Sequence, residues 1–400
     1  MKNYILITLL IYPIVMGCSG NKKNQHHDSI ETISYDVREA ENNMDITSLI
    51  DTSYFEIIPL ETTDECLIAT VSRIYLSNNK IIVYDEMAQG AYIFNRDGSY
   101  HAKVRAIGQG PGEYPSGIND IMVSKNHIGV LAPPFGIMLY DFDGKFVRKI
   151  SLEGAWGMSL LTFDDINYYL VNNWSRSERG YYHLFKLDTK ENKVYTMFPF
   201  PKSDEENDRG WSLDKYYTLY DNSALIYFGS IDTVYNLTPS GELSPRYLID
   251  IVHKKLPDHL KTGNGRAAVQ SWIDHGYILG VHSILETSRY LILNMGGDPN
   301  VVYDKKEKEI KAMATSFIIS SFYNLGSTLF FSTDEGDTLL MYMNGGIANM
   351  AKAYIASEKA QKTWTKGDGE NVFEKEYFKV LQNVQDEEDN PIVFIFKMKD

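Results

Sequence analysis

A hairpin unit that recurs along the chain is the feature that most constrains its fold. The segments AYIFNRDGSY at 91–100 and IMLYDFDGKF at 137–146 share an apolar run, an Asp-Gly turn and an aromatic return. An Asp-Gly pair between two alternating runs is a strong hairpin signal. More degenerate copies lie at 182–198, 233–249 and 301–312. The chain is therefore built from repeated antiparallel units.

The spacing of these hairpins predicts the architecture. Taking one aromatic residue per hairpin as equivalent gives spacings of 46, 45, 50 and 68 residues, between Phe94, Tyr140, Phe185, Tyr235 and Tyr303. A four-stranded propeller blade occupies roughly 40–50 residues. The repeat therefore predicts a β-propeller, whose blades are arranged around a central channel.

The two ends of the chain are expected to close the ring. Strands are predicted within 328–343 and at 391–396, and together they make a sixth, interrupted unit. The strand 54–60 has no hairpin partner nearby, and it can complete the last blade and cover an edge that would otherwise invite aggregation. We predict an all-β fold, a six-bladed propeller of four-stranded blades over residues 46–400, closed by N- and C-terminal strands.

Two segments depart from the blade pattern and predict short helical inserts. In 252–275 the spacing between hairpins lengthens, which suggests a short helix over one face. In 348–389 an apolar stripe at helical spacing predicts packing against the core, through Phe373, Tyr377, Val380, Leu381 and Val384.

The first residues carry an export signal. Lys2 is followed by the apolar stretch 4–15, which is shorter than the ~20 residues of a membrane span, so residues 1–17 are interpreted as a signal peptide. The run Val-Met-Gly-Cys that ends at Cys18 resembles a lipobox, which implies lipid attachment at Cys18. Residues 18–45 are then a lipidated, flexible tether. The alternative is an ordinary secretory signal with a chance cysteine.

The tether also bears on location. Ser19 after the cysteine resembles the pattern of lipoproteins sent to the outer membrane, and an acidic cluster typical of surface export is missing from the tether. We predict an exported protein that is anchored to the cell envelope through lipid, in the outer membrane, with the periplasmic face favoured over the surface.

Charge and cysteine content exclude some partners and cross-links. The formal net charge of -14 disfavours phosphate backbones, so no nucleic-acid partner is expected. If Cys18 carries lipid, Cys66 is the one remaining cysteine, and no intrachain disulfide can form. The content of 28 Tyr and 18 Phe suits a large β protein.

Three stretches carry a resemblance to a known group. They are PLETTDECLI at 59–68, GQGPGEY at 108–114 and DNPIVF at 389–394. With the lipobox, they resemble the six-bladed β-propeller lipoproteins of Bacteroidota, relatives by fold of NHL-repeat and TolB-like propellers. Cys66 departs from the small polar residue common at its position. The resemblance implies a fold and no common reaction, because one fold hosts many functions.

The glycine run invites a phosphate-loop interpretation, which its spacing does not support. A P-loop needs Gly-Lys-Ser/Thr at the start of a helix, and a dinucleotide site needs a differently placed third glycine. We expect a mainly structural loop where the chain crosses between blades, with a ligand loop as the alternative. The residues are Gly108, Gln109, Gly110, Pro111, Gly112 and Glu113.

Candidate channel residues are those at the expected starts of inner strands. They are Arg73, Asn119, Asp120, Trp211 and His282. Each has an ordinary alternative, because a lone Asp often caps a turn and a lone His is often a satisfied strand residue. The catalytic residues stay unknown, since the sequence contains no nucleophile elbow, no His-Glu-x-x-His and no cysteine pair for a metal.

The sequence favours a non-catalytic binding or scaffold propeller at the cell envelope, for a protein, peptide or glycan partner. No cofactor or metal site is predicted for that role. The alternative is a metal-assisted hydrolase or lyase at the mouth of the central channel, with a divalent metal and with Asp120 and His282 among its ligands. The sequence leaves the ligand, the presence of catalysis and the oligomeric state open.

Overall fold

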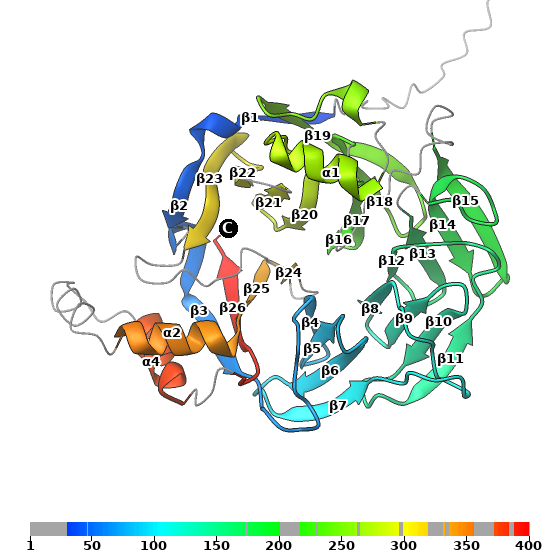
Figure 1. The fold of residues 1–400 in the computed structure, drawn as a ribbon, viewed down its shortest axis with the longest axis horizontal. Helices are drawn as coiled ribbons and strands as arrows, with labels where there is room; N and C mark the ends of the chain where they lie inside the picture. Colours follow the sequence, from blue (N-terminus) through cyan, green and yellow to red (C-terminus); the bar gives the residue numbers. More distant parts are fainter. Residues whose placement is uncertain are drawn as a thin grey trace, which may run out of the picture.

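The computed structural model shows six β-sheets arranged as a ring around a central axis, so the predicted six-bladed propeller is confirmed (Figure 1). The structure describes residues 30–45, 47–172, 175–200, 217–228, 231–261, 265–295, 299–318, 331–332, 336–355, 372–383 and 388–399. In this part of the chain, no helix is long and apolar enough to cross a membrane.

Blades 1, 2 and 3 are consecutive antiparallel four-stranded sheets. Blade 1 contains β4 (Arg73–Ser77), β5 (Lys80–Asp85), β6 (Gly90–Asn95) and β7 (Tyr100–Val104). Blade 2 contains β8 (Asp120–Val123), β9 (Ile128–Ala132), β10 (Gly136–Tyr140) and β11 (Phe146–Ile150). Blade 3 contains β12 (Ser159–Thr162), β13 (Asn167–Val171), β14 (Tyr182–Asp188) and β15 (Lys193–Pro199).

Blades 4, 5 and 6 include strands from the N-terminal part of the chain. Blade 4 contains β16 (Tyr217–Tyr220), β17 (Ser223–Ile226), β18 (Thr233–Leu237), β19 (Leu243–Val252) and β1 (Glu31–Asp36). Blade 5 contains β20 (Val281–Glu286), β21 (Tyr290–Met295), β22 (Asn300–Asp304), β23 (Glu309–Ile318) and β2 (Glu41–Asp45). Blade 6 contains β24 (Phe331–Ser332), β25 (Thr338–Met343), β26 (Ile392–Met398) and β3 (Ile50–Pro59).

The five aromatic residues that were aligned in the sequence occupy the same strand of successive blades. They lie on β6, β10, β14, β18 and β22, the third strand in each case. In blades 1, 2, 4 and 5 the pairing with the fourth strand shifts register directly before this residue, at Phe94, Tyr140, Tyr235 and Tyr303. Such a bulge bends and twists the outer strand. The repeat therefore encodes the same local bend four times.

Both chain ends close the ring as predicted. The N-terminal strand β3 pairs antiparallel with the C-terminal strand β26, in a register that places Pro59 opposite Ile392. Asn390 fixes the start of this closure, because its side-chain Nδ2 donates to the carbonyl oxygens of Glu61 and Cys66 at 2.7 and 2.8 Å. The sequence stretches 59–68 and 389–394 are thus brought together at the closure.

The predicted flexible tether extends too far along the chain. Within 18–45, the strands β1 and β2 instead form the outer edges of blades 4 and 5, each parallel to its neighbour. β1 buries Ile33 and Tyr35, whereas β2 buries none of its side chains, and both strands pair with the rows of backbone groups that β19 and β23 offer. The propeller accordingly begins at Glu31 and not at residue 46, and Cys18 lies outside the described residues.

The helical inserts are confirmed. The first insert holds the short 3-10 helix η4 (Asp258–Leu260) and α1 (Gly265–Asp274), and the second holds α2 (Gly345–Ile355) and α4 (Val372–Asn383). Two more 3-10 turns join the N-terminal strands, η1 (Val37–Glu39) and η2 (Thr47–Leu49). Tyr377 and Leu381 are buried as the apolar stripe predicted, whereas the side chains of Phe373 and Val384 lie outside the description.

The core lies between the faces of neighbouring blades. Ile82 and Ile93 of blade 1, for example, share a buried cluster with Val130 and Met138 of blade 2. In blades 1 and 2 the second and third strands pack on both faces, and they are nearly continuous buried runs. The first strands are left to line the central axis, and they position the site.

Candidate functional site

The first strands of the blades present two different ends to the central channel. One end is formed where β4, β8 and β12 begin, and it is buried. The other is formed by the turns that follow the first strands, and it opens into a cavity. We call these the buried end and the mouth.

An ion pair between Arg73 and Asp120 forms the centre of the buried end. These residues begin β4 and β8, and their side chains are 7% and 0% exposed. The Arg73 guanidinium bonds Asp120 Oδ1, and the Ile121 N–H donates to the same oxygen at 2.8 Å. Asp120 Oδ2 accepts from the Leu160 N–H at 2.8 Å. One carboxylate therefore joins the first strands of blades 1, 2 and 3.

Two buried tyrosines extend this network. The Tyr75 hydroxyl lies 3.3 Å from Arg73 Nη1, and the Tyr217 hydroxyl donates to the Leu160 carbonyl at 2.7 Å. Burial raises the pKa of Tyr75 to about 12, so its hydroxyl stays protonated at neutral pH. The polar groups at this end are largely occupied by one another, which makes it a structural junction.

The structure gives the other sequence candidates separate positions. Asn119 precedes β8, and its Nδ2 donates to the Gly157 carbonyl at 2.7 Å. His282 is half-buried on β20 of blade 5, while the bonds described for Asp120 go to blades 1, 2 and 3. Trp211 lies outside the described residues. Arg73 and Asp120 are thus the pair of candidates that the structure joins.

The metal-site hypothesis gains no support from this geometry. Both oxygens of Asp120 already accept hydrogen bonds, from a guanidinium and two backbone N–H groups, so coordination of a cation would cost those bonds. Within the described residues, no group of three or more His, Cys, Asp or Glu is placed to hold a metal ion.

The glycine run forms a tight loop between β7 and β8. The Glu113 carboxylate accepts from the Gly110 N–H at 2.7 Å, and the Gly112 carbonyl accepts from the Tyr140 hydroxyl at 2.6 Å. Gly112 has φ +80°, and a Cβ there would lie 2.5 Å from the Phe146 ring. These contacts fit the structural interpretation of the loop, in which glycine allows the crossing between blades.

The mouth holds a cavity of about 790 Å³, lined by five of the six blades. Its wall comes mainly from the turns after β4, β8, β12, β16 and β24. The lining residues are Asn78, Val123, Ser124, Lys125, Asn126, Thr162, Phe163, Asp164, Asp165, Leu219, Tyr220, Asp221, Asn222, Ser223, Gly336 and Asp337. The volume lies in the range of small-molecule sites.

Turn chemistry explains why Asn and Asp surround this cavity. The loops between β4 and β5 and between β16 and β17 have two residues each, as the pairs Ser77–Lys80 and Tyr220–Ser223 show. Asn78, Asn79, Asp221 and Asn222 have φ between 45° and 58°. Positive φ at both positions defines the hairpin turns that favour Asn and Asp.

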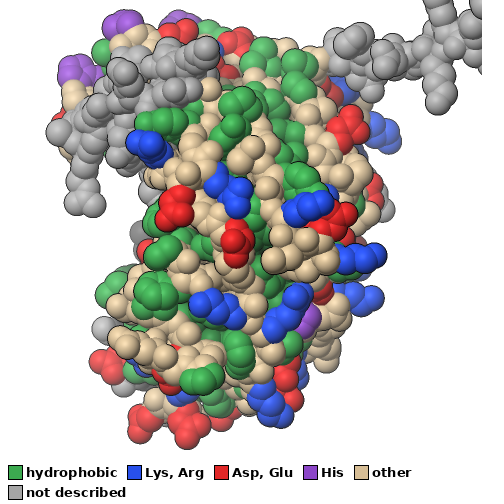
Figure 2. All heavy atoms as spheres, turned by 90° about the vertical axis from the view of Figure 1, so that its right-hand side faces the viewer, with side chains coloured by type: hydrophobic (Ala, Val, Ile, Leu, Met, Phe, Trp, Pro, Cys, Tyr) green, Lys and Arg blue, Asp and Glu red, His purple; other side chains and the backbone are tan. Residues whose placement is uncertain are grey.

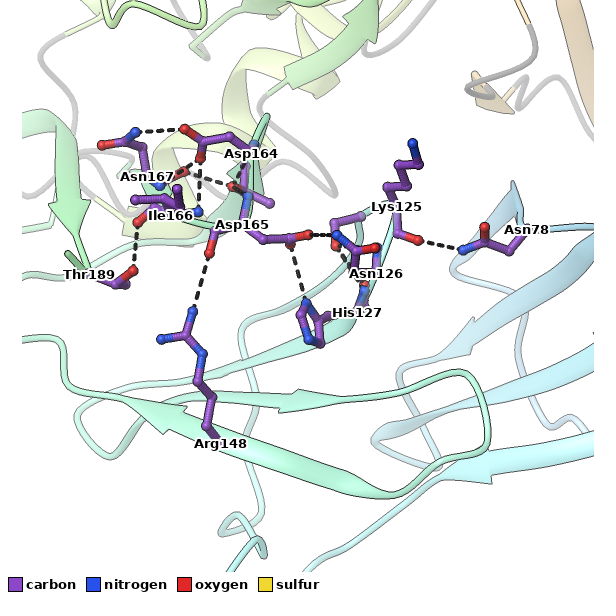
Figure 3. Close-up of polar contacts among 12 residues, drawn as sticks. Asn78, Lys125, Asn126, His127, Arg148, Asp164, Asp165, Ile166, Asn167 and Thr189 are labelled. Carbon is purple, nitrogen blue, oxygen red and sulfur yellow. Dashed lines mark hydrogen bonds and ion pairs between the residues drawn. The ribbon is translucent and has the colours of Figure 1, made fainter.

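Neighbouring turns are tied together around the rim, as Figure 3 shows. The Asn78 amide donates to the Lys125 carbonyl at 2.6 Å, and the Asn126 amide donates to Asp165 Oδ2 at 2.7 Å. Asp165 Oδ1 also lies 3.5 Å from His127 Nδ1. Blades 1, 2 and 3 therefore hold the rim in a fixed shape.

Other rim groups are also occupied. Asp164 Oδ1 accepts from the backbone N–H groups of Ile166 and Asn167 at 2.9 and 2.7 Å (Figure 3). Burial by itself raises the pKa of Asp164, but these N–H donors outweigh it and hold the pKa below its ordinary value. On the opposite side, Asp337 of blade 6 accepts from Ser288 N–H at 2.6 Å.

Four polar groups that line the cavity have no hydrogen-bond or ion-pair partner in the part of the chain that the structure describes. Within the described residues, the Lys125 ammonium, the Tyr220 hydroxyl, the Asp221 carboxylate and the Asn222 amide make no hydrogen bond or ion pair. They come from blades 2 and 4, on either side of the occupied turn of blade 3. The mouth therefore combines a fixed rim with donors and acceptors that are available to a ligand.

Sequence reasoning missed the mouth. Asn78, Asp221 and Asn222 read only as turn punctuation between predicted strands. A usable signal was present, because the turn after each first strand recurs at a fixed place in the repeat and must face the channel. The sequence candidates lie instead at the starts of the first strands, where Arg73 and Asp120 are buried.

The chain is similar to solved structures of proteins from Bacteroides species. A protein of Bacteroides fragilis described as exported is 18% identical, with a TM-score of 0.69, over 92% of this chain and 100% of that one. A member of the DUF4221 family from Bacteroides vulgatus is 14% identical, with a TM-score of 0.48, over 87% and 97%. The likeness to the Bacteroides fragilis protein concerns the fold. No curated protein matches the sequence.

A family model gives the classification. It matches residues 32–397, and thus the propeller together with nearly all of β1. The chain belongs to the family defined by the domain of unknown function DUF4934.

Proposed function

We propose that this protein is an exported lipoprotein of the cell envelope and acts as a non-catalytic binding propeller. In this proposal Cys18 carries the lipid, and the mouth receives part of a protein, peptide or glycan partner. The observation that carries it is the set of available polar groups in the 790 Å³ cavity. The description of the Bacteroides fragilis structure as an exported protein fits this location.

The chemistry of the mouth favours binding over catalysis. Its two lining serines are engaged with backbone carbonyls, Ser124 with His127 at 3.2 Å and Ser223 with Tyr220 at 2.9 Å. Neither has a base positioned to activate it within the described residues, and no His or Cys is among the lining residues. An activated nucleophile needs such a neighbouring base.

A retention experiment tests the role of the mouth. The full chain with Cys18→Ser is mixed with purified outer-membrane fractions and its retention is measured with and without the mouth change Lys125→Ala/Asp221→Asn. We expect at least a tenfold loss of retention, since one or two hydrogen bonds to charged groups are worth about 1.5–3 kcal/mol each. The matched control is Lys145→Ala/Asp143→Asn, on the exposed turn between β10 and β11. Equal retention of both variants would contradict the proposal.

The lipid anchor is tested separately. The wild-type protein should sediment with membranes and incorporate labelled fatty acid, and Cys18→Ser should move it to the soluble fraction without lowering its melting temperature. Protease treatment of intact cells then distinguishes the two faces, because a periplasmic protein is protected. Fractionation of Cys18→Ser with membranes would rule out anchoring through this residue.

A further inference from the structure

The ligand class of the mouth follows from the kinds of side chain that line it. Four of the lining residues are aspartates and three are asparagines, and of these Asp221 and Asn222 make no hydrogen bond or ion pair within the described residues. A carboxylate accepts through two oxygens, and a carboxamide both donates and accepts. Pairs of adjacent hydroxyl groups match such forks, because each hydroxyl can donate and accept at once.

The charge of the cavity wall narrows the class of ligand further. Four carboxylates face one ammonium, Lys125, in a chain whose net charge is already -14. Phosphates, sulfates and uronic acids would meet repulsion here. A neutral hydroxylated ligand meets no such penalty.

Aromatic rings add a second kind of contact. Phe163 of blade 3 and Tyr220 of blade 4 line the cavity and are both half-buried. Phe163 is held edge-on against Tyr169, with ring centroids 5.9 Å apart, and Lys305 Nζ lies 4.8 Å from the Tyr220 ring centroid. Rings that are fixed in place bury the apolar faces of a ligand at low entropic cost.

The Tyr220 hydroxyl is a donor under physiological conditions. Burial raises the pKa of Tyr220, and the negative charges of Asp337, Glu286 and Asp221 raise it further. With the Lys125 ammonium and the Asn222 amide, the wall thus offers donors as well as the Asp221 acceptor.

The geometry points to a carbohydrate site: we infer that the mouth binds a short neutral oligosaccharide. This inference rests on the proposed function, since it names the ligand of the same cavity. A peptide is the less favoured occupant. Peptides are usually bound along an exposed strand edge or in an apolar groove, whereas this wall is made of closed hairpin turns with polar side chains.

Calorimetry with defined sugars tests the inference. The full chain with Cys18→Ser is titrated with maltotriose, mannotriose, xylotriose and chitotriose, and with trigalacturonate as the anionic counterpart. We expect at least one neutral trisaccharide to bind and trigalacturonate to give no heat.

The variants respect the turn chemistry. Asp221→Asn with Asn222→Gly keeps residues that tolerate positive φ, and it removes one carboxylate and one amide from the wall. We expect at least a tenfold weaker affinity. Asn79→Gly is the matched control, because Asn79 has φ 58° in the same kind of turn and does not line the cavity. Its affinity should be unchanged.

The outcomes separate the two proposals. Neutral binding that is weakened by the Asp221/Asn222 variant and kept by Asn79→Gly supports the saccharide. Tight binding of trigalacturonate overturns it. If no trisaccharide binds while the mouth change still abolishes retention on outer-membrane fractions, the saccharide inference fails and a peptide or protein partner remains. If neither response occurs, both proposals fail.

Discussion

The outer strands of blades 4 and 5 differ from those of blades 1 and 2 in length and in covering. β19 and β23 have 10 residues each, whereas β7 and β11 have 5. The long strands carry a further parallel strand, β1 or β2, and the short ones carry none among the described residues (Figure 1). A long open edge is a template for aggregation, and a short one is a weaker template.

The covering of blade 4 is anchored by side chains as well as by backbone pairing. Ile33 and Tyr35 of β1 are 1% and 4% exposed and belong to the core cluster of blades 3, 4 and 5. Glu31 accepts from the Tyr303 hydroxyl at 2.7 Å and pairs with Lys308 at 2.5 Å. β1 is therefore part of the packed propeller and links blade 4 to blade 5.

The uncovered edges are protected by their side chains. In β11, Arg148 and Lys149 lie beside exposed Phe146 and Val147. Figure 2, which views the right-hand side of Figure 1, shows basic and acidic side chains scattered among apolar ones on this face. Charges on an edge oppose pairing with another chain. Blades 4 and 5 thus cover their long outer strands with a further strand, whereas the short outer strand β11 carries charged side chains.

Removal of both covering strands should have the largest effect. Deletion of residues 30–45 exposes the edges of β19 and β23 and removes two buried side chains worth about 1.5–3 kcal/mol each. We expect a large fall in melting temperature and self-association, measured by thermal unfolding and light scattering. A chain that lacks only residues 19–29 is the control. A stable monomer after deletion of 30–45 would contradict the protective role of β1 and β2.

Truncation of one buried side chain tests how firmly β1 is anchored. Ile33→Ala should destabilise the protein by about 2–4 kcal/mol, because it leaves a cavity under β1. Thr32→Ala in the same strand is exposed and should cost about 0.5 kcal/mol or less. Val147→Ala on the uncovered β11 should behave like Thr32→Ala. Urea unfolding measures all three, and equal effects of Ile33→Ala and Val147→Ala would show that β1 is not anchored.

The smallest effect should come from the charge on β1. Burial by itself raises the pKa of Glu31, but Lys308 and Tyr303 outweigh it, so the pKa lies below its ordinary value of 4.5. A lowered pKa stabilises the folded state above the unfolded pKa, and this contribution is lost as the pH falls through the folded pKa. Glu31→Gln should therefore cost about 0.5–1 kcal/mol at pH 7. The gap in unfolding free energy should close below pH 4.5, and a constant gap would contradict this account.

Much of the fold could be predicted because its signals are local. The hairpin pattern and its spacing predicted blades, and five hairpins with one interrupted unit predicted their number. The buried end was predicted in part, since Arg73 and Asp120 are candidates at the expected starts of inner strands and form an ion pair in the structure. The mouth was not predicted. Asp221 and Asn222 form a hairpin turn and also line the cavity, and the sequence pattern indicates only the turn.

The sequence by itself determined the repeated hairpin, the six-bladed ring and its closure by both ends, because strand alternation and turn residues act over a few positions. Only the tertiary structure decided that β1 and β2 cover blades 4 and 5, where Ser34 bonds Asp250 across 216 positions. It also decided which turns share the mouth. These contacts depend on edges and angles that exist only after the blades have packed, so no local pattern can record them.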